Sequence, residues 1–183
     1  MKKILAVFAL SLASLGALAE RADSLKQAKV DFDDAHIDEV TQTRIFTGNV
    51  VLTRGTLLIK ADKAMLKESP EGYMSVILTA APSKAASFRQ KRDGGPDLWT
   101  EGQAQRIEYD ERTELVKLFS NAVVKQLEGK RVTSEVNGPF ISYDNRTEQA
   151  NVRNDASGES KPGGGRSTII IAPRRTAPAA PAG

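Results

Sequence analysis

The sequence predicts an all-β, antiparallel fold for most of the chain, on three observations. From Lys29 to about Val152, apolar and polar residues alternate with a period of two, as in Val30-Asp31-Phe32-Asp33. Turn residues, glycine above all, separate these segments at short intervals. A hairpin-like stretch from Phe46 to Asp62 has a second copy later in the chain. Short strands with one solvated face are typical of antiparallel sheets.

Residues 1–19 predict a secretory signal peptide that is cleaved after Ala19. Met1-Lys2-Lys3 is a basic start, Ile4 to Gly16 is an apolar run, and Ala17-Leu18-Ala19 fits the small-x-small cleavage rule. The apolar run is shorter than the roughly 20 residues that a membrane-spanning helix needs. No cysteine follows the cleavage site, which excludes a lipoprotein anchor. We therefore expect an exported and released protein.

The charge distribution excludes a nucleic-acid-binding protein, and the cysteine content excludes a disulfide-stabilised fold. The formal net charge of the chain is +3, and Lys2 and Lys3 leave with the signal, so +1 remains. The charges are interspersed rather than gathered in the basic patch that nucleic-acid binding requires. The chain contains no cysteine, so stability must come from paired strands and an apolar interior rather than from disulfides.

The alternating region divides into strands and turns along the chain. The stretch Phe46–Asp62 contains two strands joined by a turn at Gly55. Gly48 lies inside the first of these strands, where an isolated glycine predicts a β-bulge or a close backbone approach rather than a chain break. Lys91–Pro96 is the clearest loop and follows a strand around Phe88.

The composition changes after the alternating region, which we place in a domain spanning residues 20–173. Residues 153–166 are rich in Asn, Ser and Gly and predict a flexible loop. Ser167–Ala172 is a β-branched run ended by Pro173 and predicts a last strand. Its edge must pair with its own sheet or with another molecule. Residues 174–183 form an Ala/Pro tail that predicts disorder.

The sequence can be aligned with itself in several places. Val30–Asp34 matches Ile107–Glu111 at an offset of 77, and Phe46 matches Phe119 at an offset of 73. This alignment makes Phe119 the second copy of Phe46.

Two further matches extend the repeat. Ile59–Ala61 matches Val136–Gly138 at an offset of 77, and Ile107–Glu114 matches Ile141–Glu148 at an offset of 34. Self-similarity of this kind indicates stacked strand-turn-strand units, either as a jelly roll of two facing sheets or as a β-solenoid.

The residues offer little for catalysis. His36 is the only histidine, and with no second histidine and no cysteine a metal site there lacks convergent ligands. His36 is also the single possible base for a nucleophilic triad, and no GxSxG elbow frames the abundant serines. The carboxylate pairs Asp31/Asp33 and Glu108/Asp110 fall on solvated positions, where solvation and turn capping explain them. We expect neither an enzyme nor a cofactor or metal site.

The remaining candidate site is the interior of the β structure. Alternation alone leaves open whether the inward residues form only a sandwich core or also a ligand-binding surface. The predicted inward set is Val30, Phe32, Phe46, Val50, Leu52, Leu57, Ile59, Phe88, Ile107, Tyr109, Phe119, Val123, Ile141 and Tyr143.

The stretch Phe-Thr-Gly-Asn-Val-Val-Leu-Thr-Arg-Gly-Thr-Leu-Leu-Ile-Lys-Ala-Asp-Lys-Ala, Phe46 to Ala64, resembles the signature of the OstA-like family of lipopolysaccharide transport proteins. The resemblance covers about Ala28 to Pro173 and includes Gly102-x-Ala104. One departure is Asn137-Gly138-Pro139, which leaves the strand register at that point open.

The resemblance implies an open, twisted antiparallel β-jelly roll in the periplasm whose inward set holds the acyl chains of lipid A. It implies head-to-tail stacking, for which the strand edge at Ile169, Ile170 and Ile171 is the candidate surface. It also implies a bridge that carries lipopolysaccharide from the inner to the outer membrane for outer membrane assembly. The implied partners are an inner-membrane LptC-type and an outer-membrane LptD-type component, which places the energy source outside this chain.

Two other functions fit the residues. A non-catalytic periplasmic polysaccharide-binding or scaffold module would use the same fold, but only 5% of the residues are aromatic and most fall at inward positions. A glycan-active enzyme using the scattered carboxylates is the weaker alternative.

Overall fold

The computed structural model describes residues 23, 26–95, 97–144, 146–147 and 149–173. The predicted signal peptide and the predicted Ala/Pro tail lie outside these residues. None of the helices within the described residues is both long and apolar enough to cross a membrane.

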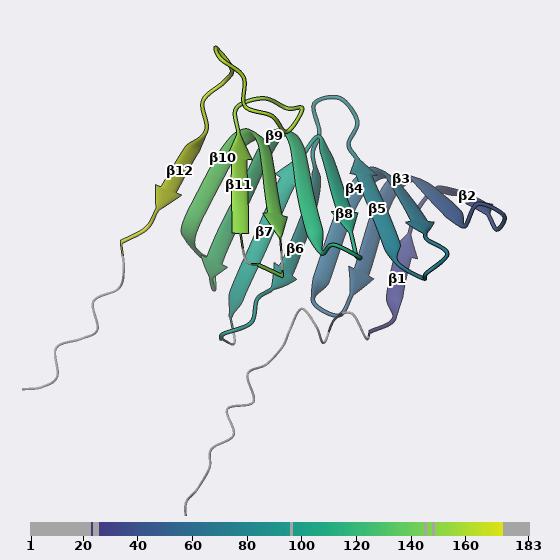
Figure 1. Cartoon of the computed structure of the whole chain (residues 1–183). Helices are drawn as coiled ribbons and strands as arrows, with labels where there is room; N and C mark the ends of the chain where they lie inside the picture. Colours follow the sequence, from purple (N-terminus) through teal and green to yellow (C-terminus); the bar gives the residue numbers. More distant parts are fainter. Residues whose placement is uncertain (1–22, 24–25, 96, 145, 148, 174–183) are drawn as a thin grey trace, which may run out of the picture.

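Twelve strands form one sheet, and every neighbouring pair in it is antiparallel, as the alternating pattern predicts. Figure 1 shows β12 at one end of the molecule, with β1 and β2 at the other. The strands are β1 (Ala28–Asp31), β2 (Asp34–Asp38), β3 (Thr43–Arg54), β4 (Leu57–Glu68), β5 (Met74–Thr79), β6 (Ala86–Lys91), β7 (Leu98–Ala104), β8 (Arg106–Asp110), β9 (Leu115–Glu128), β10 (Arg131–Asp144), β11 (Gln149–Arg153) and β12 (Thr168–Ile171).

Four long strands divide the sheet into two facing layers. β3, β4, β9 and β10 each pair with one set of short strands in one half and with another set in the other half. Layer A contains β2, β5, β8 and β11 with the adjoining halves of the long strands. Layer B contains β1, β6, β7 and β12 with the remaining halves.

The long strands change layer at β-bulges. The register between β3 and β4 shifts between Thr47 and Val50, which confirms the bulge predicted at Gly48. Gly48 and Asn49 have φ angles of 75° and 48°, in the left-handed region that favours glycine. A side chain on Gly48 would also overlap the carboxyl group of Asp33, so only glycine fits here. A bulge bends a strand and increases its twist.

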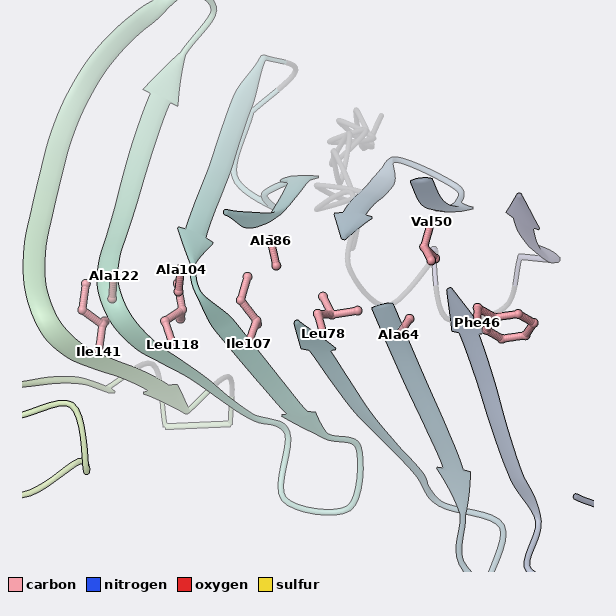
Figure 2. Packing of buried hydrophobic residues seen from close by; sticks show 10 residues of the cluster. All are labelled: Phe46, Val50, Ala64, Leu78, Ala86, Ala104, Ile107, Leu118, Ala122 and Ile141. Carbon is pink, nitrogen blue, oxygen red and sulfur yellow. The ribbon is translucent and has the colours of Figure 1, made fainter. Parts of the chain in front are cut away.

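The core lies between the layers. Figure 2 shows ten buried side chains in a line along the gap, contributed by both layers. They are Phe46, Val50, Ala64, Leu78, Ala86, Ala104, Ile107, Leu118, Ala122 and Ile141.

The second copy of the repeat has a different register from the one the sequence suggested. Leu118, not Phe119, occupies the place of Phe46, because Leu118 lies opposite Ile107 just as Phe46 lies opposite Ala35. The predicted offsets of 73 for Phe46 and of 77 for Val30–Asp34 are therefore wrong, and both segments repeat at an offset of 72.

Other matches in the repeat are confirmed. The register left open at Asn137–Pro139 contains a bulge between Gly138 and Phe140. This bulge lies opposite Ser120 and Asn121, whose φ angles are 62° and 54°. It therefore repeats the bulge at Gly48 in the first copy. The offset of 34 also has a structural basis, because β8 and β10 flank β9 at the same level.

An aspartate closes each of two equivalent turns. Asp38 accepts hydrogen bonds from the amides of Val40 and Thr41 at 2.9 and 3.0 Å. Asp110 accepts bonds from the Thr113 amide and hydroxyl at 2.8 and 2.7 Å. Hydrogen bonds to the charged form lower the pKa of both carboxyl groups, mainly from the Thr41 amide for Asp38 and the Thr113 hydroxyl for Asp110.

We expect replacement of Thr113 by Val to raise the pKa of Asp110 part of the way towards its ordinary value. Because the folded pKa lies below that of the unfolded chain, these bonds stabilise the fold above about pH 3.9 and lose that effect as the pH falls through the folded value. A carboxyl NMR titration of the wild-type and Thr113→Val proteins measures the shift. An unchanged pKa in the variant would show that the hydroxyl does not stabilise the carboxylate.

The inner face as candidate functional site

A continuous apolar row crosses layer A on its inner side. Residues that lie directly opposite each other in adjacent strands share one face of a sheet. Successive pairings therefore place one residue from each of six strands on the same face: Phe46, Ala64, Leu78, Ile107, Leu118 and Ile141. Each of these side chains is at most 7% exposed, so this row is the floor of layer A.

Layer B carries a facing row built in the same way. Its pairings join Leu52, Ile59, Phe88, Gly102, Val124 and Val136. The ring of Phe88 lies where a side chain on Gly102 would be, so glycine at this position provides the space for the ring. The two rows together give the inner face an apolar lining in both layers.

Burial along the inner face depends on distance from the bulges. Val50, Ala86, Ala104 and Ala122 lie near the bend and are at most 1% exposed, and three of these four are alanines that allow the layers to approach closely. Farther out, side chains on the same face are only half-buried. They are Leu57, Leu66, Val76, Tyr109, Val116 and Tyr143. The outer part of the inner face thus presents apolar surface to solvent.

Eleven of the fourteen residues predicted to point inward lie on the inner face. Five are buried, namely Phe46, Val50, Leu52, Ile107 and Ile141. Six are half-buried, namely Val30, Leu57, Ile59, Phe88, Tyr109 and Tyr143.

The inward prediction is wrong for Phe119 and Val123. Phe119 lies opposite Arg106 and Phe140 on the outer face of layer A. The Arg106 Cζ atom lies 4.2 Å from the centre of its ring, and the Phe140 ring packs edge-on at 5.1 Å. Val123 lies next to the inward Val124 in β9 and lines a depression of about 210 Å³ on the outer face of layer B. The two-residue bulge between Phe119 and Ala122 separates the two layers in β9.

Phe32 lies at the end of the inner face that is next to β1. It follows β1, its side chain is 43% exposed, and its ring lies 4.8 Å from that of Phe46. It therefore extends the inner face to the edge of the molecule at β1, where one side of the ring remains accessible.

Sequence reasoning missed several residues of the inner face. Leu78 and Leu118 belong to the buried core, as do the alanines at positions 64, 86, 104 and 122. The two turns Asp38-x-x-Thr41 and Asp110-x-x-Thr113 carry the signal that would have found Leu118, since aligning them gives the correct offset of 72. Alanine gives no comparable signal, because it is common on both faces of a sheet.

The predicted stacking edge is solvent-exposed. Ile169, Ile170 and Ile171 are 61%, 57% and 71% exposed, and among the described strands β12 pairs only with β10, on one side. The Ala172 amide donates to the Thr133 carbonyl at 2.9 Å. Because amides alternate in direction along a strand, the Ile170 amide also points to β10, whereas those of Ile169 and Ile171 point to the free edge.

No group of three or more metal-binding side chains occurs within the described residues. His36 lies on the exposed strand β2 opposite Ile45. The features that the described residues do provide at this site are apolar side chains on the inner face and exposed strand edges.

A single antiparallel sheet whose long strands change layer and enclose an apolar inner face defines the protein as a β-jelly roll. The sequence profile of the family described as LptA/(LptD N-terminal domain) LPS transport protein matches residues 29–149. The chain belongs to this family of lipopolysaccharide transport proteins.

Individual relatives agree with this assignment. The lipopolysaccharide export system protein LptA of Haemophilus influenzae is 30% identical over 159 residues, which cover 87% of each chain. LptA of Escherichia coli K12 is 31% identical over 131 residues, covering 72% of this chain and 66% of the relative. The crystal structure of LptH from Pseudomonas aeruginosa, described as the LptA homologous periplasmic component of the lipopolysaccharide transport device, matches with a TM-score of 0.67. It is 25% identical and covers 82% of this chain and 99% of that one.

Proposed function

We propose that this protein is a non-enzymatic periplasmic bridge that carries lipopolysaccharide from the inner to the outer membrane. Its inner face holds the lipid A acyl chains, and copies stack head to tail between an LptC-type component at the inner membrane and an LptD-type component at the outer membrane. The observation that carries the proposal is the apolar inner face, which runs the length of the sheet and reaches both free edges.

The half-buried part of the inner face is the surface that the acyl chains contact. Burying one methylene group is worth about 0.8 kcal/mol, so exposing a chain of a dozen methylenes to water would cost on the order of 10 kcal/mol. Tyr109, Val116 and Tyr143 follow one another across adjacent strands and offer similar burial at each step. Similar affinity at successive positions keeps the barriers to lateral movement low, so direction comes from an energy source in a partner.

The placement of the buried core refines this picture. The row near the bulges is packed and holds the layers together, whereas the residues farther out keep apolar surface accessible. Core and lipid path are thus neighbouring zones of one face. Lipid binding needs no unfolding of the packed zone.

We expect a photo-crosslinking amino acid at Phe88 to capture lipopolysaccharide, whereas the same amino acid at Arg89 does not. The two residues are neighbours in β6, but Phe88 points to the inner face and Arg89 points outward, where it pairs with Glu101 at 3.0 Å. Phe32 and Asp31 form a second matched pair at the end of the molecule. Immunoblotting for lipopolysaccharide after irradiation measures the capture.

Equal capture at the inward and outward positions would overturn the inner face as the lipid site. Mass spectrometry of the native protein provides an independent readout, because a lipid carrier is expected to co-purify with lipid. A protein that binds polysaccharide instead would retain no acyl chains. The only tryptophan, Trp99, has one ring face covered, because the Arg89 guanidinium lies 4.4 Å from the centre of its ring.

A further inference from the structure

The molecule consists of two copies of one six-strand unit. β5 and β6 both pair with β4, and in the same way β11 and β12 both pair with β10. Phe88 of β6 and Ile169 of β12 therefore occupy equivalent places, as do Leu78 of β5 and Val152 of β11. At the start of each unit, β1 and β2 pair with β3 as β7 and β8 pair with β9.

The two units are joined by one strand pair in each layer. In layer B, β6 pairs with β7, with Phe88 opposite Gly102. In layer A, β5 pairs with β8, with Leu78 opposite Ile107. We call these two strand pairs the internal junction. They show how the end of one unit binds the beginning of another.

The molecule ends on unpaired copies of the same edges. We call β11 and β12 the tail edge and β1 and β2 the head edge. Within the described residues, each of these four strands pairs with a neighbour on one side only. The tail edge corresponds to β5 and β6 at the internal junction, and the head edge corresponds to β7 and β8.

We infer that copies of this chain bind one another by repeating the internal junction, including its register. β12 of one copy pairs antiparallel with β1 of the next, with Ile169 opposite Val30. β11 pairs with β2, with Val152 opposite Ala35. This inference rests on the head-to-tail stacking proposed above and adds which residues lie opposite each other across the contact. In this register both layers of the sheet continue from one molecule into the next.

The backbone of the free edges is oriented for this pairing. At the internal junction the Arg92 amide donates to the Leu98 carbonyl at 2.8 Å, so the Phe88 amide, four residues earlier, also points to β7. Ile169, the equivalent of Phe88, has its amide on the free side of β12. On β1, the neighbouring Asp33 amide donates towards β3, which leaves the Val30 amide on the free side.

Exposed apolar side chains gather at the same edges. Among the residues that the structure describes, eight large hydrophobic residues are exposed, and five of them lie here: Phe32 and Ile37 at the head edge and Ile169–Ile171 at the tail edge. Ala104 is the equivalent of Phe32 at the internal junction and is fully buried there. Pairing in the inferred register covers Phe32 in the same way.

The register also brings together opposite charges that lack partners. Arg153 and Asp34 are equivalent to Thr79 and Arg106, which lie opposite each other at the internal junction. Both side chains are exposed, and neither forms an ion pair with another of the described residues. A shift of one or two residues along the strands would separate the two charges, so the pair favours the inferred register over its neighbours.

Cysteine cross-linking between two single variants tests the register, because the natural chain contains no cysteine. The inferred pairing places Ile170 opposite Lys29 and Thr168 opposite Asp31. Lys29 and Asp31 project from the same side of β1, and their side chains are 71% and 58% exposed, so each is a matched control for the other. Under mild oxidation, we expect Ile170→Cys to cross-link with Lys29→Cys at least tenfold faster than with Asp31→Cys. For Thr168→Cys the preference reverses.

A charge exchange provides a second readout. Asp34→Arg and Arg153→Asp are each expected to weaken self-association at least threefold in sedimentation velocity, and a chain carrying both changes is expected to recover it. If the protein stacks but the cysteine preferences are reversed, or the double variant does not recover self-association, the inferred register is wrong. Either result would leave the proposed bridge function unaffected. A wild-type protein that stays monomeric at every concentration would overturn the stacking as well.

Discussion

Replacing Leu118 with alanine is expected to lower the free energy of unfolding by about 2–5 kcal/mol, the usual cost of removing a large buried aliphatic side chain. Leu118 is 1% exposed and lies between Ile107 and Ile141 in the buried row of layer A. The surrounding strands are held by their ladders, so the cavity cannot collapse fully. Urea denaturation followed by circular dichroism measures the loss.

The neighbouring residue is the control. Phe119→Ala removes a larger side chain from the outer face, where it contacts Arg106 and Phe140. Aromatic and cation–π contacts at such sites contribute about 0.5–1.5 kcal/mol each, so the variant is expected to lose less stability than Leu118→Ala. A larger loss for Phe119→Ala would contradict the repeat register and restore Phe119 as the equivalent of Phe46.

Replacing Ile169 with proline is expected to weaken end-to-end assembly tenfold or more while leaving the isolated fold intact. The Ile169 amide faces the free edge of β12, so proline removes a donor that only a neighbouring molecule can use. Its ring also occupies space that the incoming strand requires. Sedimentation velocity measures the oligomer size, and thermal unfolding at low concentration measures the fold.

Two further variants separate the backbone contribution from other causes. Ile169→Ala keeps the amide and is expected to stack more tightly than Ile169→Pro, because edge pairing depends mainly on main-chain hydrogen bonds. Ile170→Pro is a poorer probe, since the amide of Ile170 points to β10 within the same chain. Unchanged oligomer size in Ile169→Pro would exclude β12 as a stacking edge.

Part of the architecture could be predicted from the sequence because local rules govern it. Alternation with a period of two predicted antiparallel strands, and the glycine inside a strand predicted the bulge at Gly48. Eleven of the fourteen predicted inward residues lie on the inner face for the same reason, since position within a strand decides the face.

The second copy could not be placed by residue similarity. Phe119 resembles Phe46 in chemistry, but the equivalent residue is Leu118, which is apolar without being aromatic. A shift of one residue along a strand moves every side chain to the other face of the sheet. Aligning Phe119 instead of Leu118 with Phe46 is such a shift, so Phe119 and Val123 were predicted on the inner face although they lie on the outer face. The turn aspartates at positions 38 and 110 keep the correct offset, since their hydrogen bonds require that place in the turn.

The sequence by itself determined the strand segments, the absence of disulfides and the family, because these depend on residue type and local spacing. Only the tertiary structure decided which apolar residues are packed core and which are accessible, since that depends on distance from the bulges where the two layers meet. It also decided that the first and last strands present the same edges that join the two halves of the molecule. Strand pairing between distant segments is a long-range property, and no local pattern contains it.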